Sequence, residues 1–322
     1  MHRIAFVALP GFRMMSLASL SAFELANSEA GEPVYELHLL SETGGLVPTS
    51  LGFGIMTEPL DGPLDGPLDK EPFDTVIVGG STVPGALTPG VIAFLQRAVQ
   101  QSRRVAATCT GAFVLAEAGL LDGRRATTHW NAARKLQARF PNVKVEEDRI
   151  FIVDGPVWTS AGMTAGIDLT LAMVEKDLGA EVARGVAKKL VVYHRRAGGQ
   201  SQFSALLALE PKSDRIQNAL AYARNNLDKA LTVGELAQAA NLSPRQFSRA
   251  FRAETGQTPA KAVERLRVEA ARLIMERSRH PIDVVARQTG FADRDRMRRA
   301  FLRAFGQPPQ VIRRNARAEA TA

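Results

Sequence analysis

The sequence has a single cysteine, Cys109, among its 322 residues, and this scarcity excludes an internal disulfide. No stretch approaches the roughly 20 apolar residues that a membrane-spanning helix needs. The first apolar run, residues 4–9, is too short for a signal peptide and ends at Pro10. We therefore expect a cytoplasmic protein without a membrane partner, and we expect neither a metal site nor a bound cofactor.

Acidic and basic residues are distributed unequally along the chain. The overall net charge is +8, and hydrophobic residues make up 45% of the sequence, which predicts an ordinary buried core. From Lys212 to the end there are 22 Lys and Arg against 11 Asp and Glu, a net of +11, so the preceding residues carry −3. The length indicates about two domains, and the charge indicates a polyanionic partner for the second one only.

A segment near the C-terminus is repeated. Residues 250–259 and 300–309 share an Ala-Phe pair, a Gly-Gln pair and a final proline at an offset of 50. A second matching piece, residues 236–242 against 285–291, lies upstream of each, with one extra residue between the pieces in the second copy. Each copy predicts two helices joined by a short turn. Two copies in a basic region indicate a protein that grips DNA twice.

In residues 1–205, short apolar runs alternate with helical patterns. Residues 4–9 and 75–78 have the length of buried strands, whereas residues 89–101 have helical spacing. This alternation predicts a doubly wound, flavodoxin-like α/β domain. A Leu-Asp-Gly-Pro unit is duplicated within residues 60–69, which predicts a surface loop made of turns.

Cys109 stands between a predicted strand, residues 104–107, and a predicted helix, residues 111–118. A side chain in such a turn projects from the carboxyl end of the sheet, where the amides of a helix N-terminus point at a bound group. The helix dipole would also lower the pKa of the thiol. A buried and inert cysteine is the alternative, but the strand–turn–helix setting favours a functional site.

The residues around this cysteine resemble a known family. Residues 105–113 and 118–130 are similar to the PfpI-like domain of GlxA-type transcriptional regulators, and residues 159–169 and 196–200 resemble its later blocks. The resemblance implies a fold akin to class I glutamine amidotransferases, with Cys109 on a nucleophile elbow. It also implies that His129 is the partner histidine and that the amides of Gly80 and Thr110 stand at the oxyanion hole.

The same resemblance implies an acidic partner for the cysteine, and here the sequence departs from the pattern. Ser21 stands where relatives carry a glutamate, and a hydroxyl cannot replace a carboxylate that shares a proton with a thiolate. Glu24 would substitute only if the first helix shifted. We therefore predict a pocket that binds a ligand without catalysis, for which a carboxylate or another anion is suited. Its expected lining is the 79–81 turn, Cys109, His129 and the 160–162 turn.

Two interpretations of His129 stay open at this point. It either lines the pocket or bonds to the backbone in a structural role, beside Trp130, which we expect in the core. For the whole domain, two alternatives to a ligand sensor also stay open. One is a cysteine-dependent hydrolase or hydratase of the PfpI type, and the other is a thiol redox sensor.

The C-terminal domain is predicted over residues 214–322, behind a linker at residues 206–213. Thr232 with Glu235 has the pattern of a capping box, and Ser243 followed by Pro244 has that of a helix start. Between the two repeats, residues 260–276 predict a long amphipathic helix. These elements form helix-turn-helix units such as those that bind DNA.

Both units resemble the AraC-type DNA-binding domain, which implies seven helices and two recognition helices in successive major grooves. The apolar positions of the recognition helices, Phe247 and Phe251 in one and Met297 and Phe301 in the other, predict their inner faces. The opposite faces carry the DNA-contacting candidates Arg245, Ser248, Arg249, Arg252, Arg294, Arg298 and Arg299. Because the two sets differ, each protomer should recognise two different half-sites about one helical turn apart.

The prediction is thus a sequence-specific transcriptional regulator whose first domain senses a small molecule without catalysis. Its expected partners are double-stranded promoter DNA, an effector for which a carboxylate-bearing metabolite is one candidate, and a second copy in a homodimer. RNA polymerase is a further candidate partner.

Overall fold

A computed structural model describes residues 1–60, 72–81, 87–192, 196, 198, 202, 211 and 213–314. The chain divides into two compact units, one within residues 1–202 and the other within residues 203–321. Most of the duplicated Leu-Asp-Gly-Pro segment lies outside the described residues. None of the described helices is long and apolar enough to cross a membrane.

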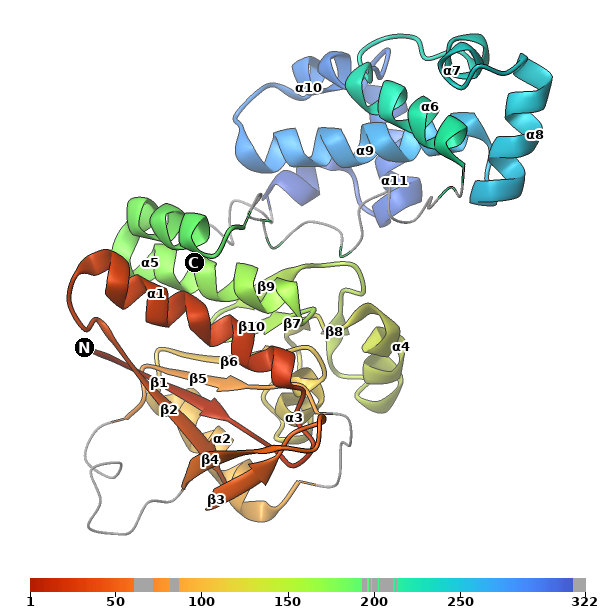
Figure 1. Cartoon of the computed structure of the whole chain (residues 1–322). Coiled ribbons are helices and arrows are strands. Elements are labelled where there is room, and N and C mark those ends of the chain that lie inside the picture. Colours follow the sequence, from red (N-terminus) through yellow and green to blue (C-terminus); the bar gives the residue numbers. More distant parts are fainter. Residues whose placement is uncertain are drawn as a thin grey trace. The chain divides into compact units, whose positions relative to one another are not determined.

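The first unit contains a sheet of eight strands among the described residues (Figure 1). Their order is β3-β4-β2-β1-β5-β6-β10-β9, with parallel pairing in the centre and an antiparallel pair at each edge. The strands are β1 (His2–Val7), β2 (Tyr35–Ser41), β3 (Thr43–Pro48), β4 (Gly54–Pro59), β5 (Thr75–Val78), β6 (Arg104–Thr108), β9 (Phe151–Asp154) and β10 (Val157–Ser160). The central strands are apolar and buried on both faces, as parallel sheets require.

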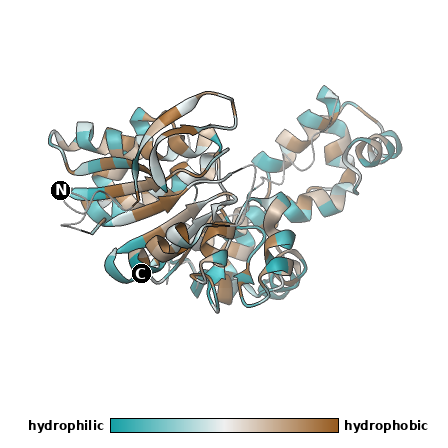
Figure 2. Ribbon diagram, turned by 90° about the horizontal axis from the view of Figure 1, so that it is seen from below, coloured by the Kyte–Doolittle hydropathy of each residue, from teal (hydrophilic) through white to brown (hydrophobic). Residues whose placement is uncertain are grey.

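Helices cover both faces of this sheet (Figure 1). Alternate residues of each strand point to opposite sides, so Ala5 and Val7 pack with α2 (Pro89–Gln101) and α3 (Gly111–Glu117). Their neighbours Ile4 and Phe6 pack with α1 (Ser21–Ala30) and α5 (Thr164–Lys189) on the other side. The predicted doubly wound α/β architecture is confirmed. Figure 2 shows the strands as mainly hydrophobic and the helices as mixed in hydropathy.

A short two-stranded sheet and one more helix follow α3. The strands are β7 (Arg125–Ala126) and β8 (Lys144–Val145), which pair in parallel, and α4 (Trp130–Arg139) connects them. Because α4 begins directly after His129, this element positions the predicted partner histidine.

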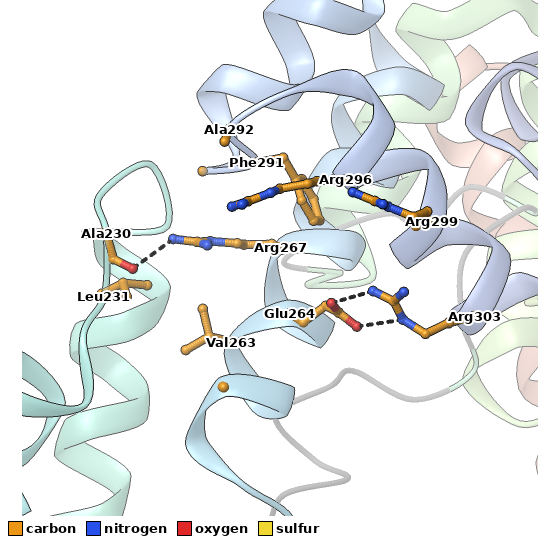
Figure 3. A pocket seen from close by; sticks show the side chains of 12 residues that line it. Ala230, Leu231, Val263, Glu264, Arg267, Phe291, Ala292, Arg296, Arg299 and Arg303 are labelled. Atoms are coloured by element: carbon orange, nitrogen blue, oxygen red, sulfur yellow. Dashed lines mark hydrogen bonds and ion pairs between the residues drawn. The ribbon is translucent and has the colours of Figure 1, made fainter.

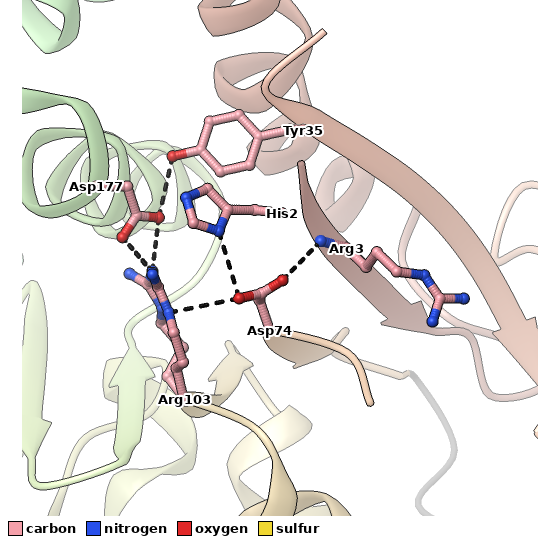
Figure 4. A network of polar contacts seen from close by, with 7 residues as sticks. His2, Arg3, Tyr35, Asp74, Arg103 and Asp177 are labelled. Carbon is pink, nitrogen blue, oxygen red and sulfur yellow. Dashed lines mark hydrogen bonds and ion pairs between the residues drawn. The ribbon is translucent and has the colours of Figure 1, made fainter. Parts of the chain in front are cut away.

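A polar network around the buried Asp177 joins α5 to the starts of the strands (Figure 4), at the end of the sheet opposite Cys109. The Asp177 carboxylate on α5 accepts hydrogen bonds from the Tyr35 hydroxyl at 3.0 Å and from the guanidinium groups of Arg103 and Arg104. Burial and the neighbouring Asp177 raise the pKa of Tyr35, so its hydroxyl stays a donor. The nearby Asp74 carboxylate accepts a bond from the Arg3 amide at 2.9 Å. The network holds α5 in place just before its kink at Gly179, which has φ 89°.

The second unit is helical throughout its regular elements. Its helices are α6 (Asp214–Asn225), α7 (Val233–Ala239), α8 (Pro244–Thr255), α9 (Pro259–Arg277), α10 (Ile282–Gln288) and α11 (Arg294–Phe305), and residues 309–314 are also helical. The described part therefore contains the seven helical segments that the resemblance implied. Two small cores stabilise them, one around Phe247 and Phe251 and the other around Met297 and Phe301.

The long helix α9 contributes to both small cores. Leu266 lies in the first core and Val268 in the second, only two residues along the same helix. The two helix-turn-helix units, α7–α8 and α10–α11, are therefore both packed on α9. The capping box predicted for α7, Thr232 with Glu235, and the helix start predicted at Ser243 and Pro244 are confirmed. At α8 the structure adds a capping box, because Gln246 pairs with Ser243.

Candidate ligand site and nucleic-acid interface

Cys109 lies in the turn that joins β6 to α3, with the unusual φ of 56°. Non-glycine residues in this left-handed region are uncommon, and such strain gathers at functional sites. Two hydrogen bonds hold the turn in this conformation. The Cys109 amide donates to the Ser160 carbonyl at 3.0 Å, and the Cys109 carbonyl accepts the Thr128 hydroxyl at 2.7 Å. The elbow geometry implied by the family resemblance is thus present.

Glycines allow three turns to meet at this cysteine. A Cβ atom at Gly162, which has φ +93°, would lie 2.2 Å from the Cβ of Cys109 and 2.9 Å from its Sγ. A Cβ atom at Gly80 would lie 2.9 Å from the same Cys109 Cβ. The 79–81, 109–111 and 160–162 turns are therefore in direct contact at one edge of the sheet, as expected for an open α/β fold.

The thiol is buried, with 5% of Cys109 exposed. Burial raises the pKa of the Cys109 thiol, while the amide and hydroxyl of Thr110 and the charge of Arg13 act in the opposite direction. The pKa of this thiol is therefore not lowered as expected, because desolvation of the buried thiolate is the largest influence on it. The Thr110 hydroxyl itself donates to the Ser81 carbonyl at 2.9 Å.

His129 stands at the N-terminal end of α4 and is partly exposed. Its Nδ1 lies 2.7 Å from the Asn131 side-chain oxygen, and its ring lies against that of Trp130 at 5.6 Å between centroids. Trp130 is 51% exposed, so the prediction that it belongs to the core is wrong. In this segment the residue that bonds to the Cys109 turn is Thr128, which the sequence motif did not single out.

Ser21 is the first residue of α1 and is partly buried, whereas Glu24 is exposed and faces away from the core. The hydroxyl that reaches the elbow belongs instead to Ser16, in the 3-10 helix η1 (Met14–Leu20). The Gly80 amide donates to Ser16 Oγ at 3.2 Å, so this candidate oxyanion-hole donor already has a partner. No sequence pattern marks Ser16, because a short 3-10 turn has no distinctive periodicity.

Further hydroxyl groups are buried beside the elbow. Thr108 and Ser160 are paired across β6 and β10, and both side-chain oxygens are buried without a hydrogen-bond partner in the described structure. A buried hydroxyl without a partner costs about 1–3 kcal/mol, and such groups call for an explanation. Together with Ser16, these hydroxyl groups give the site a polar lining. No carboxylate is among the groups that shift the pKa of the Cys109 thiol.

The recognition helix of the first helix-turn-helix unit, α8, separates its apolar and basic residues as predicted. Phe247 and Phe251 are fully buried, whereas Arg245, Arg249 and Arg252 are exposed. These three arginines make no hydrogen bond or ion pair with the described residues, so their guanidinium groups are available. Ser248 is partly buried, and its hydroxyl donates to the Pro244 carbonyl at 2.9 Å.

In the second unit, α11 buries Met297, Ala300 and Phe301 and exposes all its arginines at positions 294, 296, 298, 299 and 303. The candidates divide between two flanks of the helix. Arg299 lines a cavity of about 500 Å³ together with Arg296 and Arg303 (Figure 3), whereas Arg294 and Arg298 are not among the lining residues. The sequence analysis places Arg299 in one set with Arg294 and Arg298. The i, i+3 and i+7 spacing of residues 296, 299 and 303 instead indicates that Arg299 shares a flank of α11 with Arg296 and Arg303.

Comparison with known proteins supports both units. Residues 3–176 match the DJ-1/PfpI family, and residues 236–315 match a helix-turn-helix domain. The chain is 31% identical to the HTH-type transcriptional regulator GbdR of Pseudomonas aeruginosa over 312 residues, which cover 95% of this chain and 83% of GbdR. It is also 31% identical to the HTH-type transcriptional regulator GlxA of Rhizobium meliloti over 329 residues, 98% of this chain and 96% of GlxA.

Two further relatives bear on the first unit. The isonitrile hydratase of Pseudomonas putida is 34% identical over 163 residues, which cover 50% of this chain and 68% of that protein. The crystal structure of an AraC family transcriptional regulator from Pseudomonas putida shares the fold, with a TM-score of 0.52 at 22% identity over 59% of this chain and 100% of that one.

Proposed function

The chain belongs to the DNA-binding transcriptional regulators that join a DJ-1/PfpI domain to an AraC-type helix-turn-helix domain, and we propose that its first unit senses a small molecule without converting it. The observation that carries this proposal is the chemistry around Cys109. A neutral buried thiol, a Gly80 amide already bonded to Ser16 and a hydroxyl lining do not supply the thiolate and proton acceptor that nucleophilic catalysis needs.

A cation at the rim of the site indicates the class of effector. Arg13 is exposed, its backbone amide donates to the Gly80 carbonyl at 2.7 Å, and its charge acts on the Cys109 thiol. Met163, with φ 54° and 37% exposed, lies next to Gly162 on the same turn. A carboxylate-bearing metabolite would pair with the Arg13 guanidinium while its apolar part contacts Met163.

A thermal-shift screen of the full chain against a panel of carboxylate-bearing metabolites tests this proposal. We expect at least one compound to raise the melting temperature, and we expect Arg13→Ala to remove that shift. Arg134→Ala is the matched control, because Arg134 is an arginine of the same unit whose side chain is 89% exposed. A shift that survives Arg13→Ala, or that Arg134→Ala abolishes equally, would contradict the assignment.

Catalysis by the first unit is the second candidate function, because an isonitrile hydratase is among the relatives. Its test is direct. If the full chain converts isonitriles, amides or aldehydes, and Cys109→Ser abolishes the turnover while DNA binding is kept, then the unit is an enzyme. Absence of turnover over the panel supports the sensor.

The remaining partners are also part of the proposal. A regulator of promoters acts in the compartment that holds the chromosome, so we place the protein in the cytoplasm. We expect it to act as a homodimer, in which each protomer binds double-stranded promoter DNA, with RNA polymerase as the machinery that it influences.

A further inference from the structure

The second unit contains a cavity of about 500 Å³ beside α9, between the loop that precedes α7 and the second helix-turn-helix unit (Figure 3). One wall is α9, another is a flank of α11, and the ends are formed by residues 230–231 before α7 and by residues 290–292 in the turn between α10 and α11. The apolar base includes Leu231, Val263 and Phe291. The cavity is therefore lined by the second helix-turn-helix unit, by α9 and by the loop that leads into the first helix-turn-helix unit.

The charged lining of this cavity is strongly positive. It comprises four guanidinium groups and one carboxylate, which leaves a formal net charge of +3. Three of the four arginines, at positions 296, 299 and 303, follow one another at i, i+3 and i+7 along α11. Since an α-helix rises 1.5 Å per residue, they form a row about 10 Å long on one flank of the recognition helix.

The four guanidinium groups differ in how firmly they are held. Arg267 donates to the backbone carbonyls of Leu227, at 3.1 Å, and Lys229, so it is part of the wall. Arg303 is paired with Glu264 at 2.7 Å, and Arg296 approaches Asp293 only to 4.0 Å. Arg299 makes no ion pair or hydrogen bond with the described residues. The row thus offers Arg299 and Arg296 first, and Arg303 if Glu264 releases it.

The position of the row points to a phosphate rather than a base. A recognition helix presents one face to base edges, while residues on its flanks meet the sugar-phosphate strands that border the major groove. The flank with Arg296 and Arg299 is turned toward α9, away from the side that carries Arg294 and Arg298. Guanidinium groups bind phosphate oxygens in a bidentate, charge-assisted manner.

We propose that the cavity between α9 and the flank of α11 binds a phosphate of the DNA strand that runs between the two recognition helices, through Arg296 and Arg299. The inference rests on DNA binding by the second unit and assigns Arg299 to the backbone instead of to base reading. Glu264 limits the contact, because its carboxylate occupies Arg303 and repels phosphate.

The test compares two neighbouring arginines of α11 in the full chain. Arg299→Ala should weaken binding to a cognate duplex and to a random duplex by a similar factor, and should lower the slope of log affinity against log salt by about one. Arg298→Ala, on the other flank, should weaken cognate binding and leave the random duplex nearly unchanged. Arg299→Ala that spares the random duplex and the salt slope would overturn the inference.

A second variant acts in the opposite direction. Glu264→Gln removes the carboxylate that holds Arg303, so we expect severalfold tighter binding to random duplex and a steeper salt slope. Asp283→Asn on α10 changes the net charge equally outside the cavity and serves as the control. Equal effects of the two variants would mean that charge alone matters and would overturn the inference.

Two further outcomes separate the sources of phosphate. In the first, inorganic phosphate at submillimolar concentration raises the melting temperature of the wild type but not of Arg299→Ala, and the salt slope for DNA is the same in both proteins. The cavity then binds a free anion, and the inference is wrong. If the wild type shows no preference for any promoter duplex over random DNA, sequence-specific regulation fails, whereas the effect of Arg299→Ala on random duplex still decides the phosphate contact.

Discussion

Gly290 lies directly against Arg267, so that a Cβ atom at position 290 would stand 2.7 Å from the Arg267 Nε. The same Cβ would lie 1.9 Å from the Leu227 carbonyl oxygen, to which Arg267 donates a hydrogen bond. Three segments therefore meet at one point: the turn between α10 and α11, the helix α9 and the loop before α7. This contact, together with the two cores that share α9, fixes the spacing of the recognition helices.

We predict that Gly290→Ala destabilises the second unit far more than Gly256→Ala. Both glycines have a left-handed φ, +73° and +71°, which costs a non-glycine residue about 1–2 kcal/mol. Only at position 290 does the added methyl group also collide with backbone and with Arg267, whereas the space around Gly256 is open. Urea unfolding of the full chain, followed by the helical signal, measures both costs, and equal costs would contradict the packing role.

Loss of Arg249 should affect one half of the DNA site only. If Arg249 reads a base in the first major groove, Arg249→Ala costs about 1–3 kcal/mol for a cognate duplex, or roughly 5- to 150-fold in affinity. A duplex already mutated in the corresponding half-site should show almost no further loss, while one mutated in the other half-site should show the full loss. Binding titrations at constant salt measure this. A uniform loss on all duplexes would reassign Arg249 to the phosphate backbone.

Gly162→Ala should disrupt the elbow, because its methyl group would stand 2.2 Å from the Cys109 Cβ. Gly119→Ala is the matched control in the same unit, since Gly119 also has a positive φ, +79°, and nothing lies within 4 Å of the added methyl. We expect Gly119→Ala to cost about 1–2 kcal/mol and Gly162→Ala to cost clearly more. Thermal unfolding of the first unit decides between them, and a Gly162 variant as stable as the Gly119 variant would show that the elbow can open freely.

The Cys109 thiol should react slowly with iodoacetamide in the native chain at pH 7–8. Burial raises its pKa, so the folded state holds the proton more tightly than the unfolded state does. The contribution of this thiol to the free energy of unfolding is complete below the pKa of an unfolded cysteine, about 8.5. It is lost as the pH rises through the higher pKa of Cys109 in the folded chain. Because the charge of Arg13 lowers this pKa, Arg13→Ala should slow native alkylation further.

Mild peroxide provides the complementary measurement. A buried neutral thiol is a poor substrate for oxidation to sulfenic acid, so DNA binding should be indifferent to peroxide. A native thiol that alkylates as fast as the urea-unfolded chain at pH 7, or a peroxide-sensitive affinity for DNA, would revive the redox-sensor interpretation.

Periodicity and caps were enough to predict the helices of the second unit, because they are local properties of the sequence. Thr232, Glu235 and Ser243 cap their helices in the structure as the pattern predicts. The cavity in the second unit was not predictable. It depends on α9, which brings residues 230, 264 and 299 together across long stretches of chain.

In the first unit, the family motif predicted the elbow but not the groups that surround it. The position of Cys109 follows from a strand, a turn and a helix in succession. Ser16, Thr128 and Arg13 reach the elbow from other segments, and no local pattern marks a hydroxyl that will bond to a distant backbone amide or carbonyl. The exposure of Trp130 was missed because aromatic residues are more often buried, and the start of α4 leaves this one on the surface.

The two recognition helices begin differently: α8 with the Ser243–Gln246 capping box, and α11 with the acidic cap Asp293 beside Arg296. Their exposed residues differ as well. Because the two recognition helices of a protomer differ, each protomer binds its DNA site in one defined direction along the chromosome. Reversing the orientation of a site relative to the start of transcription would exchange the positions of α8 and α11 along the promoter, so that regulation would depend on orientation.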